Sequence, residues 1–458
     1  MRNTRLNLLN RFRWVFCQLE ILRDCLPPSV RRILDELPES LDETYEGILK
    51  EIKKPNRDHA RRLLQCLVVA IRPLRVEELA EVLAVDFDNA DGTPKLNPKW
   101  RWEDEEQALL ASCSSLIAIV RSGGSRVVQF SHFSVREFLT STRLATSSGD
   151  VLRYHIALEP AHTILAQACM SILLRSDDRD EQSGDDVGNN SALAEYAAEH
   201  WAAHAQFEHV SSPLRTSMES LFDQDKPYFA AWLELCDIDT PSPAGSTLYH
   251  FTPAGKHGGS PLYYAALCGF QDLVEYLIVK YPQHVNASGG SYFTPLVAAL
   301  AGKHFQTAEL LRHSGADPNV QCDGGNTPLH SATRYGDVEM VQVLLNLEAD
   351  VNIRNDDSRS PLNYISVDSG EGPNSLQSLA NVARLLLDRG ADIHARNNWG
   401  RTPLHSMAMV GRIDITRVLV ERGADVSAKD EEGRTPFSLA KEGRHDEIMK
   451  LLSEYGAQ

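Results

Sequence analysis

The chain has 458 residues, and its hydrophobic fraction of 42% and charged fraction of 24% are those of a globular protein, which excludes an intrinsically disordered chain. A formal net charge of -17 argues against a polyanion-binding protein, and no apolar run approaches the roughly 20 residues of a transmembrane helix. The eight cysteines show no C-x-x-C spacing, which predicts free thiols and a cytoplasmic location.

Residues 1–56 are predicted to form a helical segment. Apolar side chains recur at helical spacing from Trp14 to Leu26, and a further helix is expected over Leu41–Lys53. Residues 1–75 carry an excess of Lys and Arg, whereas the rest of the chain is acidic. The basic block is either a surface for an acidic partner or, as is commoner, a solvated helix face.

Residues 57–150 have the element order of a winged-helix domain. Helices are predicted over Arg57–Ile71, Val76–Val85, Glu103–Cys113 and Ser134–Ser141, and strands over Ser115–Val120 and Arg126–Phe130. The two strands flank Gly123 and Gly124 and are expected to form a hairpin. A winged helix can bind DNA, but the acidic run Glu103–Glu106 and the lack of a dense basic recognition helix favour a packing role.

Residues 151–247 are predicted to be a helical linker domain. They are rich in alanine, and an acidic, polar interruption over Ser176–Asn190 is expected to be an exposed loop. Packed helices are expected around Trp201 and over Pro227–Leu235. The segment Asp239–Gly259 is predicted to be a hinge into the C-terminal part of the chain.

Residues 248–458 contain one tetrapeptide pattern six times. It reads Ser260-Pro261-Leu262-Tyr263, Thr294-Pro295-Leu296-Val297, Thr327-Pro328-Leu329-His330, Ser360-Pro361-Leu362-Asn363, Thr402-Pro403-Leu404-His405 and Thr435-Pro436-Phe437-Ser438. The prolines are spaced by 34, 33, 33, 42 and 33 residues. This period with this tetrapeptide is the signature of ankyrin repeats. The additional residues of the fourth repeat, around Val367–Leu376, are expected to form a loop.

The repeat pattern has a direct structural meaning. In each unit the Ser or Thr is expected to cap a helix whose first turn holds the proline, where a missing N–H is harmless. Each repeat buries its apolar face only against its neighbours, so six repeats form a solenoid. The predicted fold class is therefore mainly α, with a winged-helix-like N-terminal region, a helical linker domain and an ankyrin-repeat α-solenoid.

No catalytic spacing is convincing in this sequence. It has no G-x-x-x-x-G-K-[ST] loop for phosphates, no G-x-S-x-G elbow and no H-E-x-x-H pair. His200 and His204 are four residues apart but have no third metal ligand, so they are expected to be packing or surface histidines. His132 is expected to cap the junction between hairpin and helix rather than act as a base. The sequence thus predicts a protein that is not an enzyme and has no cofactor or metal.

The repeats predict a protein-binding face. Ankyrin arrays present the fingertip before each tetrapeptide and the end of each first helix on their concave side. The residues expected there are Gln321, Asp323, Asn326, Arg334, Tyr335, Arg396, Asn398, Trp399, Arg401 and Met409. Trp, Tyr and Arg often carry interface energy. Trp399 is expected either to contact a partner or to fold against Arg401 or the next fingertip.

The chain resembles the C-terminal part of fungal NLR-like (STAND) NACHT–ankyrin proteins. Besides the repeats, the resemblance rests on Arg13–Leu19, Leu37–Tyr45, Ile71–Leu74 and Phe130–Leu139, the last three being similar to the winged helix of GPI inositol-deacylase-like proteins. In that family an upstream NACHT module exchanges nucleotide and gates oligomerisation, while the repeats sense a ligand. This chain begins after that module, so it is expected to be a fragment, a truncated gene product or a regulator that pairs with a full-length relative.

Three functions remain as hypotheses. The first is a non-enzymatic, cytoplasmic interaction protein of an NLR-like signalling system, with protein partners on the concave ankyrin face and a NACHT-containing relative as a further candidate partner. The second is an adaptor that delivers clients to a catalytic partner. The third is a winged-helix regulator that binds nucleic acid.

Overall fold

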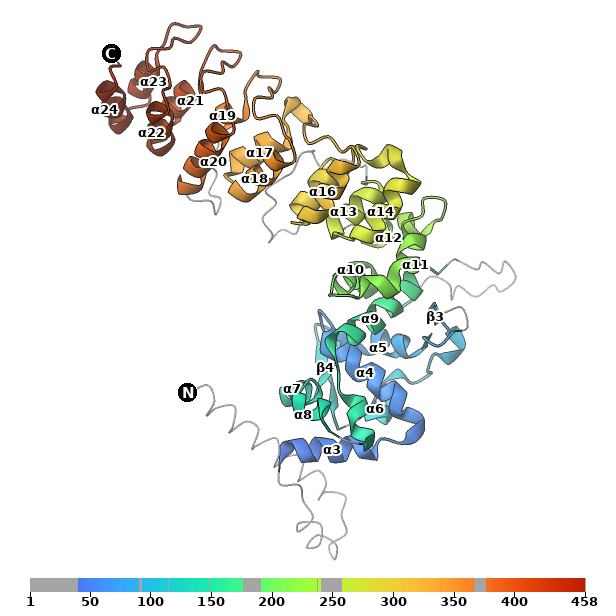
Figure 1. Ribbon diagram of the computed structural model, residues 1–458. Helices are drawn as coiled ribbons and strands as arrows, with labels where there is room; N and C mark the ends of the chain where they lie inside the picture. The colour runs from blue at the N-terminus through green and yellow to red at the C-terminus, as the bar shows by residue number, and fades with distance from the viewer. Residues whose placement is uncertain are drawn as a thin grey trace, which may run out of the picture. The chain divides into compact units, whose positions relative to one another are not determined.

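The computed structural model is mainly α-helical, as the sequence predicts, and divides into two compact units, Met1–Asp237 and Ile238–Gln458 (Figure 1). It describes residues 40–89, 93–113, 115–147, 149–175, 191–236, 238–239, 258–365 and 376–457. Several predictions lie outside these residues: the helix from Trp14 to Leu26, the segment Arg13–Leu19, the interruption Ser176–Asn190, and most of the hinge and of the Val367–Leu376 insertion.

The first unit begins with the elements of a winged helix. Its helices are α3 (Leu41–Glu51), α4 (Arg57–Val69), α5 (Val76–Leu83), α6 (Glu105–Cys113), α7 (Phe133–Leu139) and α8 (Thr142–Ala145). Its strands are β1 (Leu74–Arg75), β2 (Val85–Asp86), β3 (Lys95–Leu96), β4 (Ile117–Ser122) and β5 (Ser125–Phe130). Short 3-10 turns cover Lys54–Asn56, Pro98–Trp100 and Gly149–Tyr154. The predicted order of three helices followed by a hairpin is confirmed.

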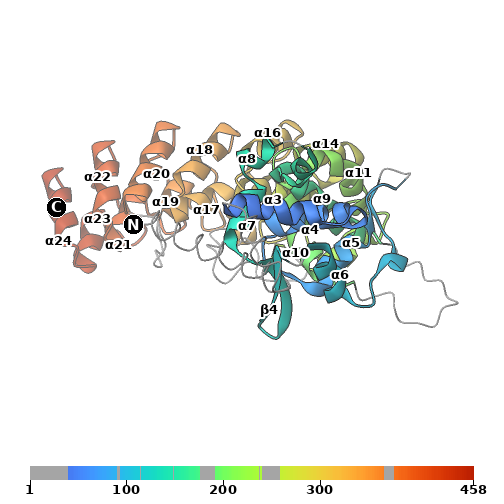
Figure 2. The ribbon, with the colours of Figure 1, turned by 90° about the horizontal axis from the view of Figure 1, so that it is seen from below.

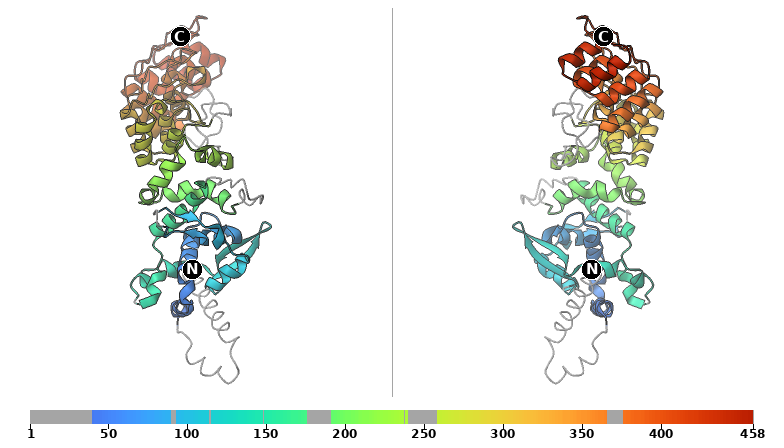
Figure 3. Two further views of the ribbon diagram at one scale, coloured as in Figure 1. Left: turned by 90° about the vertical axis from the view of Figure 1, so that its right-hand side faces the viewer. Right: turned by 90° about the vertical axis from the view of Figure 1, so that its left-hand side faces the viewer.

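The hairpin reaches further than predicted. Strand β5 pairs antiparallel with β4 on one side and with β1 on the other, in the order β1-β5-β4. Gly123 and Gly124 both have positive φ, 57° and 87°, which suits a two-residue turn that continues the strand twist. The ladder therefore runs out to the Ser122–Ser125 pair, and the hairpin extends away from the helices of its unit (Figure 3).

A buried carboxylate fixes the start of α5. Glu78 is fully buried and accepts two hydrogen bonds from the Arg72 guanidinium, at 2.9 and 2.8 Å, and one from the Arg75 backbone N–H at 2.7 Å. Burial alone would raise the pKa of Glu78, but these hydrogen bonds and the nearby positive charges outweigh it and lower the pKa. The carboxylate stays charged and holds the Arg72–Arg75 segment against the helix.

The same segment joins the winged helix to the linker helices. These are α9 (Leu158–Leu173), α10 (Ala194–Ala205), α11 (Ser211–Leu221) and α12 (Tyr228–Leu235). The Ile71 N–H donates to the Tyr196 hydroxyl at 3.2 Å, and the Arg72 guanidinium lies 4.9 Å from the centre of the Tyr196 ring. Arg75 forms an ion pair with Glu195 at 2.5 Å. Helix α10 is thereby bonded to the winged helix within one unit.

The linker helices enclose an aromatic core. Trp201, Phe222 and Trp232 are fully buried, with ring centroids 5.5 to 6.0 Å apart, and the Trp232 indole N–H donates to the Ala198 carbonyl at 3.0 Å. The packed helices expected around Trp201 and over Pro227–Leu235 are present as α10 and α12. Aromatic rings of this size supply much of the apolar burial that a small helical domain needs.

His204 is a packing histidine in this core. It is fully buried, its Nδ1 lies 2.8 Å from His162 Nδ1, and its Nε2 lies 2.9 Å from the Tyr196 hydroxyl. Burial, with smaller contributions from His162 and His200, lowers the pKa of His204 to about 3. The imidazole is therefore neutral in the folded protein throughout the physiological range.

The neutral His204 makes stability depend on pH. Below its ordinary pKa near 6.5, the unfolded chain binds a proton that the folded chain does not, so stability falls as pH falls. Between pH 6.5 and 5 we expect the free energy of unfolding of the first unit to drop by about 2 kcal/mol more in the parent than in His204→Gln. Urea denaturation followed by tryptophan fluorescence measures this, and equal pH profiles for the two proteins would contradict it.

The second unit is a stack of six helix pairs within the described residues. The pairs are α13 (Pro261–Cys268) with α14 (Gln271–Lys280), α15 (Pro295–Ala301) with α16 (Phe305–His313), α17 (Pro328–Tyr335) with α18 (Val338–Asn346), α19 (Pro361–Tyr364) with α20 (Leu376–Asp388), α21 (Pro403–Val410) with α22 (Ile413–Glu421), and α23 (Pro436–Glu442) with α24 (Asp446–Glu454). Figure 2 shows α17 to α24 in successive rows. Two 3-10 turns, Pro282–His284 and Asp323–Gly325, lie between pairs.

Each first helix begins as the tetrapeptide predicts. Proline occupies the first helical turn in all six first helices of the described array. The preceding Ser or Thr is extended in every case, and in four of the six its hydroxyl caps the helix, as Ser260 does toward the Tyr263 N–H at 3.2 Å. The Thr327 and Thr402 hydroxyls instead contact Nδ1 of His330 and His405, at 2.9 and 2.8 Å. Pattern and capping together set where every repeat starts.

In four of the six described repeats the fourth residue of the tetrapeptide bonds to the next repeat, whereas Val297 of the second repeat has no polar side chain to do so. His330 is fully buried, accepts the Thr327 N–H through Nδ1 at 3.2 Å and donates through Nε2 to the Arg359 carbonyl at 3.0 Å. His405 donates in the same way to the Arg434 carbonyl at 3.1 Å. In the first repeat the residue is a tyrosine: the Tyr263 hydroxyl donates to Asp239 at 2.7 Å and accepts the Tyr292 N–H at 3.1 Å.

Removing one of these bridges should weaken the stack. We expect His330→Ala to lower the free energy of unfolding of the array by about 2 kcal/mol, because it deletes a buried hydrogen bond and leaves the Arg359 carbonyl without that donor. Urea denaturation followed by circular dichroism measures the loss. His394→Ala, at an exposed position, is the matched control and should change stability little. An equal loss in both variants would refute the bridging role.

Candidate protein-binding face of the repeat array

The fingertip loops of the array share one internal geometry. The backbone N–H of Asn355, Asn397 and Asp430 donates to the carbonyl four residues later, at 3.1, 3.1 and 2.9 Å. The side-chain oxygens of the same three residues accept the N–H groups two and four residues on, for example from Trp399 and Arg401 to Asn397, both at 3.0 Å. Asn and Asp favour such turns because their short side chains satisfy the local backbone.

Neighbouring fingertips are also bonded to each other. The backbone N–H of Asp356 donates to the Gly324 carbonyl at 3.1 Å, that of Asn398 to Asp357 at 3.0 Å, and that of Glu431 to Trp399 at 3.1 Å. Gly325, with φ of 68°, lies against the next fingertip, where an added Cβ would come within 2.7 Å of the Asp356 nitrogen. The fingertips form a continuous, hydrogen-bonded edge whose side chains are held in place.

Trp399 lies on this edge with an exposed fraction of 41%. The Arg359 guanidinium is 5.1 Å from the centre of the indole ring, so the contact is with the preceding fingertip. The sequence predicts that Trp399 contacts a partner or folds against Arg401 or the next fingertip, and Arg359 is not among the predicted contacts. A cation over an exposed tryptophan contributes about 0.5–1 kcal/mol and leaves the other ring face to solvent.

Arg401 is less available than predicted. Its Nε lies 3.3 Å from the Asp430 carboxylate and its Nη1 lies 3.4 Å from the Met409 sulfur. Asp430 is buried and also receives the Arg434 guanidinium. Burial alone would raise the pKa of Asp430, but hydrogen bonds from Arg434 and Arg401 outweigh it and lower the pKa. Arg401 therefore braces a fingertip and positions Met409, which is 39% exposed.

The other predicted residues fall into two groups. Gln321, Arg396 and Asn398 are exposed and donate from their side chains to the backbone of the next or preceding fingertip. Asn326 is half-buried and accepts from the Asn355 amide at 2.9 Å, and Arg334 lies over the Tyr364 ring at 5.8 Å. Tyr335 is 37% exposed at the end of α17. The side chain of Asp323 lies outside the described residues.

Arg359 and Tyr364 were missed. Arg359 directly precedes its tetrapeptide, as Arg401 and Arg434 precede theirs. This recurrence was visible in the sequence. It marks arginines whose carbonyls accept a hydrogen bond from a histidine of the preceding repeat, or whose side chains contact the next fingertip. We call Tyr335, Arg359, Trp399 and Met409 the exposed aromatic–arginine face.

A histidine–serine pair lies in the first unit. His132 caps α7, as predicted, because its Nδ1 accepts the Ser134 N–H at 3.3 Å and lies 2.6 Å from the Ser134 hydroxyl. A serine this close to a histidine has the spacing of a nucleophile and base. The Ser134 hydroxyl, however, is covered, with an exposed fraction of 6%, and lies 2.8 Å from the Tyr45 hydroxyl. This arrangement favours capping and packing.

No disulfide joins the cysteines within the described residues. Cys66, Cys113, Cys169 and Cys268 are buried, and Cys236 and Cys322 are half-buried. Burial raises the pKa of Cys66, Cys113 and Cys268 to about 12, which keeps these thiols protonated. Cys17 and Cys25 lie outside the described residues. Within the described ranges no three His, Cys, Asp or Glu side chains gather as metal ligands, and none of the helices there is long and apolar enough to span a bilayer.

Three stretches of the chain match known families. Residues 48–148 match the winged helix domain of GPI inositol-deacylase, and residues 296–345 and 375–458 match ankyrin repeats. The chain thus carries a winged helix of this type followed by ankyrin repeats, which are non-catalytic interaction modules. The matches are in keeping with the hydrogen-bonded fingertips and helix pairs seen in the second unit.

Several known proteins are similar to parts of the chain. The azaphilone pigments biosynthesis cluster protein L of Monascus ruber is 30% identical over 300 residues, or 62% of this chain and 61% of that protein. The target of rapamycin complex 2 subunit AVO2 of Saccharomyces cerevisiae is 28% identical over 108 residues, 23% of this chain and 25% of that protein. Ankyrin repeat and SOCS box protein 9 of Mus musculus is 28% identical over 131 residues, 27% and 44% respectively. The chain spans about three fifths of the pigment-cluster relative and a quarter of the yeast subunit.

Proposed function

We propose that this chain is a non-enzymatic interaction protein that binds a protein partner on the concave face of its ankyrin array. The observation that carries the proposal is the exposed aromatic–arginine face, with Arg359 and Trp399 on hydrogen-bonded fingertips and Tyr335 and Met409 near the ends of first helices. Trp399, Met409 and Tyr335 are 41%, 39% and 37% exposed, and apart from Val279 and Tyr455 the other large apolar side chains described in the array are mostly buried. Tryptophan, tyrosine and arginine are the residues that most often dominate binding energy at interfaces.

The rigidity of the fingertips strengthens this proposal. Binding costs less when the contacting side chains are already ordered in the free protein. Trp399 is held by the Asn397 turn through its backbone and by Arg359 across its ring. An interface built here would lose little side-chain entropy on association.

We further propose that the chain belongs to an NLR-like signalling system and acts in the cytoplasm. The resemblance of a GPI inositol-deacylase-type winged helix followed by ankyrin repeats to NACHT–ankyrin proteins supports the first part, with a NACHT-containing relative as the second partner. Buried, protonated thiols suit a reducing compartment. In this proposal residues 1–56 resemble the end of a NACHT module, residues 57–150 and 151–247 form the winged helix and linker, and residues 248–458 recognise the partner.

Two features weigh against the nucleic-acid alternative. Helix α6, third in the winged helix, begins with Glu105 and Glu106. On the wing, Arg126 is paired with Glu106 at 2.8 Å and with Glu77 at 3.0 Å. Two carboxylates at the start of α6 repel phosphates, and the charge of the wing arginine is already neutralised by its two ion pairs. Both features weaken the attraction for a nucleic-acid backbone.

The adaptor alternative remains compatible with the same face. The name of the yeast relative describes a subunit of a larger complex, which is the setting that an adaptor needs. Such an adaptor would present a client on the array while another surface contacts a catalytic partner. It differs from the first hypothesis in requiring two partners bound at once.

The test uses the full chain as bait in host-cell lysate, followed by binding measurements with the purified partner. We expect Trp399→Ala to weaken binding about 30-fold, equivalent to about 2 kcal/mol, because it removes a rigid anchor. The variant should lose no more than about 1 kcal/mol of stability, the size of its contact with Arg359.

The matched control is Trp100→Ala, which removes a tryptophan that is 47% exposed in the other unit. Its binding should equal that of the parent. A partner retained by Trp399→Ala but lost by Trp100→Ala would place recognition on the winged helix and refute the proposed face. A loss of array stability well above 1 kcal/mol in Trp399→Ala would show that the indole is core.

A further inference from the structure

Three consecutive fingertips place carboxylates on both sides of the Trp399 indole. Each closed loop has two residues at its apex, directly after Asn355, Asn397 or Asp430, and these pairs are Asp356-Asp357, Asn398-Trp399 and Glu431-Glu432. The apexes before and after the one that carries the indole therefore hold four carboxylates. None of the three apexes holds a lysine or an arginine.

Hydrogen bonds make the three apexes immediate neighbours. The Asn398 N–H donates to the Asp357 carbonyl at 3.0 Å, and the Asn398 side-chain amide donates to the Asp356 carbonyl at 3.0 Å. On the other side of the same apex, the Glu431 N–H donates to the Trp399 carbonyl at 3.1 Å. The acidic residues therefore flank Trp399 in space, although they come from different repeats.

The arginines of these loops compensate only part of the apex charge. The Asp357 carboxylate lies 3.7 Å from the Arg359 guanidinium, and the Glu432 carboxylate lies 2.8 Å from that of Arg434. The other carboxylate of each acidic apex is exposed and has no ion-pair partner among the described residues. One uncompensated negative charge thus remains on either side of Trp399.

The other cations of these fingertips lie at the loop bases. Arg354 donates to the Arg396 carbonyl at 3.0 Å, and Arg396 donates to the Lys429 carbonyl at 2.7 Å. Both guanidinium groups are therefore engaged at the base of the following fingertip. Lys429 is exposed and directly precedes Asp430, so it also belongs to a loop base.

The Trp399 indole already accepts a cation on one face, where the Arg359 guanidinium lies 5.1 Å from the ring centre. An aromatic ring is electrostatically negative on both faces, so the opposite face attracts a second cation. With an exposed fraction of 41%, the indole is accessible to such a group. The uncompensated carboxylates of Asp356 and Glu431 add to this attraction.

We propose that the protein partner presents an arginine-bearing segment, with one guanidinium against the open face of Trp399 and pairing with Asp356 or Glu431. Arginine suits this position because its planar group stacks on a ring while its N–H groups donate to a carboxylate. An acidic or phosphorylated segment would be repelled by the apex carboxylates. This inference rests on the proposed function and specifies the chemistry of the partner.

The test is isothermal titration calorimetry of the full chain at about 50 mM salt, where surface charges are weakly screened. The probes are a capped peptide in which two arginines alternate with glycine and serine, and the same peptide with glutamate in place of arginine. The arginine peptide should bind at least about tenfold more tightly than the glutamate peptide. Trp399→Ala should weaken binding of the arginine peptide about fivefold or more.

Two charge-matched variants separate the apex carboxylates from the overall negative charge of the protein. Asp356→Asn/Glu431→Gln should weaken binding of the arginine peptide about fivefold. Asp272→Asn/Glu309→Gln removes two exposed carboxylates from α14 and α16 and should leave binding unchanged. Circular dichroism checks that all variants are folded. The proposal is wrong if the parent does not bind the arginine peptide at millimolar concentration, if the glutamate peptide binds as well, or if both double variants lose affinity equally.

The captured partner distinguishes this inference from the proposed function. If its affinity falls in Trp399→Ala but not in Asp356→Asn/Glu431→Gln, the binding face is correct and the cationic partner segment is wrong. If Trp399→Ala leaves the affinity of the captured partner unchanged, the proposed function itself is wrong.

Discussion

The array depends on hydrogen bonds that leave four of its six described repeats through the fourth tetrapeptide residue, which is Tyr263, His330, Asn363 or His405, and enter the next repeat. A two-helix repeat cannot bury its apolar face alone, so its stability comes from the neighbour. His330 and His405 meet this constraint in the same way, each capping its own helix through Nδ1 and reaching the following fingertip through Nε2. Because the acceptor is the carbonyl just before the next tetrapeptide, the bond fixes the fingertip and the helix together. Burial lowers the pKa of His330 to about 4, which keeps this imidazole neutral and able to accept and donate at once.

The exposure of the proposed binding face follows from that constraint. Each arginine that precedes a capping Ser or Thr exchanges hydrogen bonds with the Asn or Asp four residues before it, which closes the fingertip loop. Successive fingertip loops are then hydrogen-bonded to one another. Side chains that point away from this edge have no core to enter, and Trp399, Tyr335 and Met409 remain partly exposed. The arginines on the edge serve two purposes, since Arg401 braces Asp430 and Arg359 orders the indole of Trp399. The proposed binding surface is thus a consequence of how the repeats are held in register.

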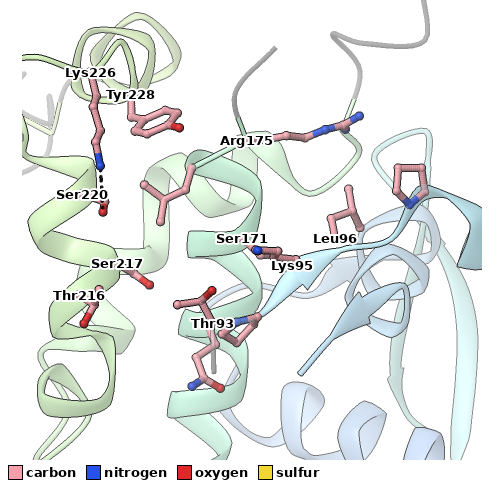
Figure 4. Close-up of a pocket in the computed structure, with 14 residues that line it drawn as sticks. Thr93, Lys95, Leu96, Ser171, Arg175, Thr216, Ser217, Ser220, Lys226 and Tyr228 are labelled. Atoms are coloured by element: carbon pink, nitrogen blue, oxygen red, sulfur yellow. Dashed lines mark hydrogen bonds between the residues drawn. The ribbon is translucent and has the colours of Figure 1, made fainter. Parts of the chain in front are cut away.

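Features that depend on residues close together in the chain could be predicted from the sequence. Features that depend on contacts between residues far apart in the chain could not. The caps, the first-turn prolines and the winged-helix order depend on residues within a few positions, and the structure shows them as expected. The His132 cap is of the same kind. The partner of Trp399 could not be read in this way, because Arg359 lies in the preceding fingertip and the fourth repeat has a longer period. A cavity within the first unit is lined by residues from Thr93 to Tyr228, a separation in the chain at which residue spacing carries no signal (Figure 4).

The most direct measurement is hydrogen–deuterium exchange of the full chain, alone and with its captured partner. Fingertip and first-helix amides between residues 320 and 410 should be protected by the partner, while amides of the first unit between residues 41 and 235 should exchange as in the free chain. That result would establish the concave ankyrin face as the recognition surface. Protection confined to the first unit would contradict the account and transfer recognition to the winged helix and its linker helices.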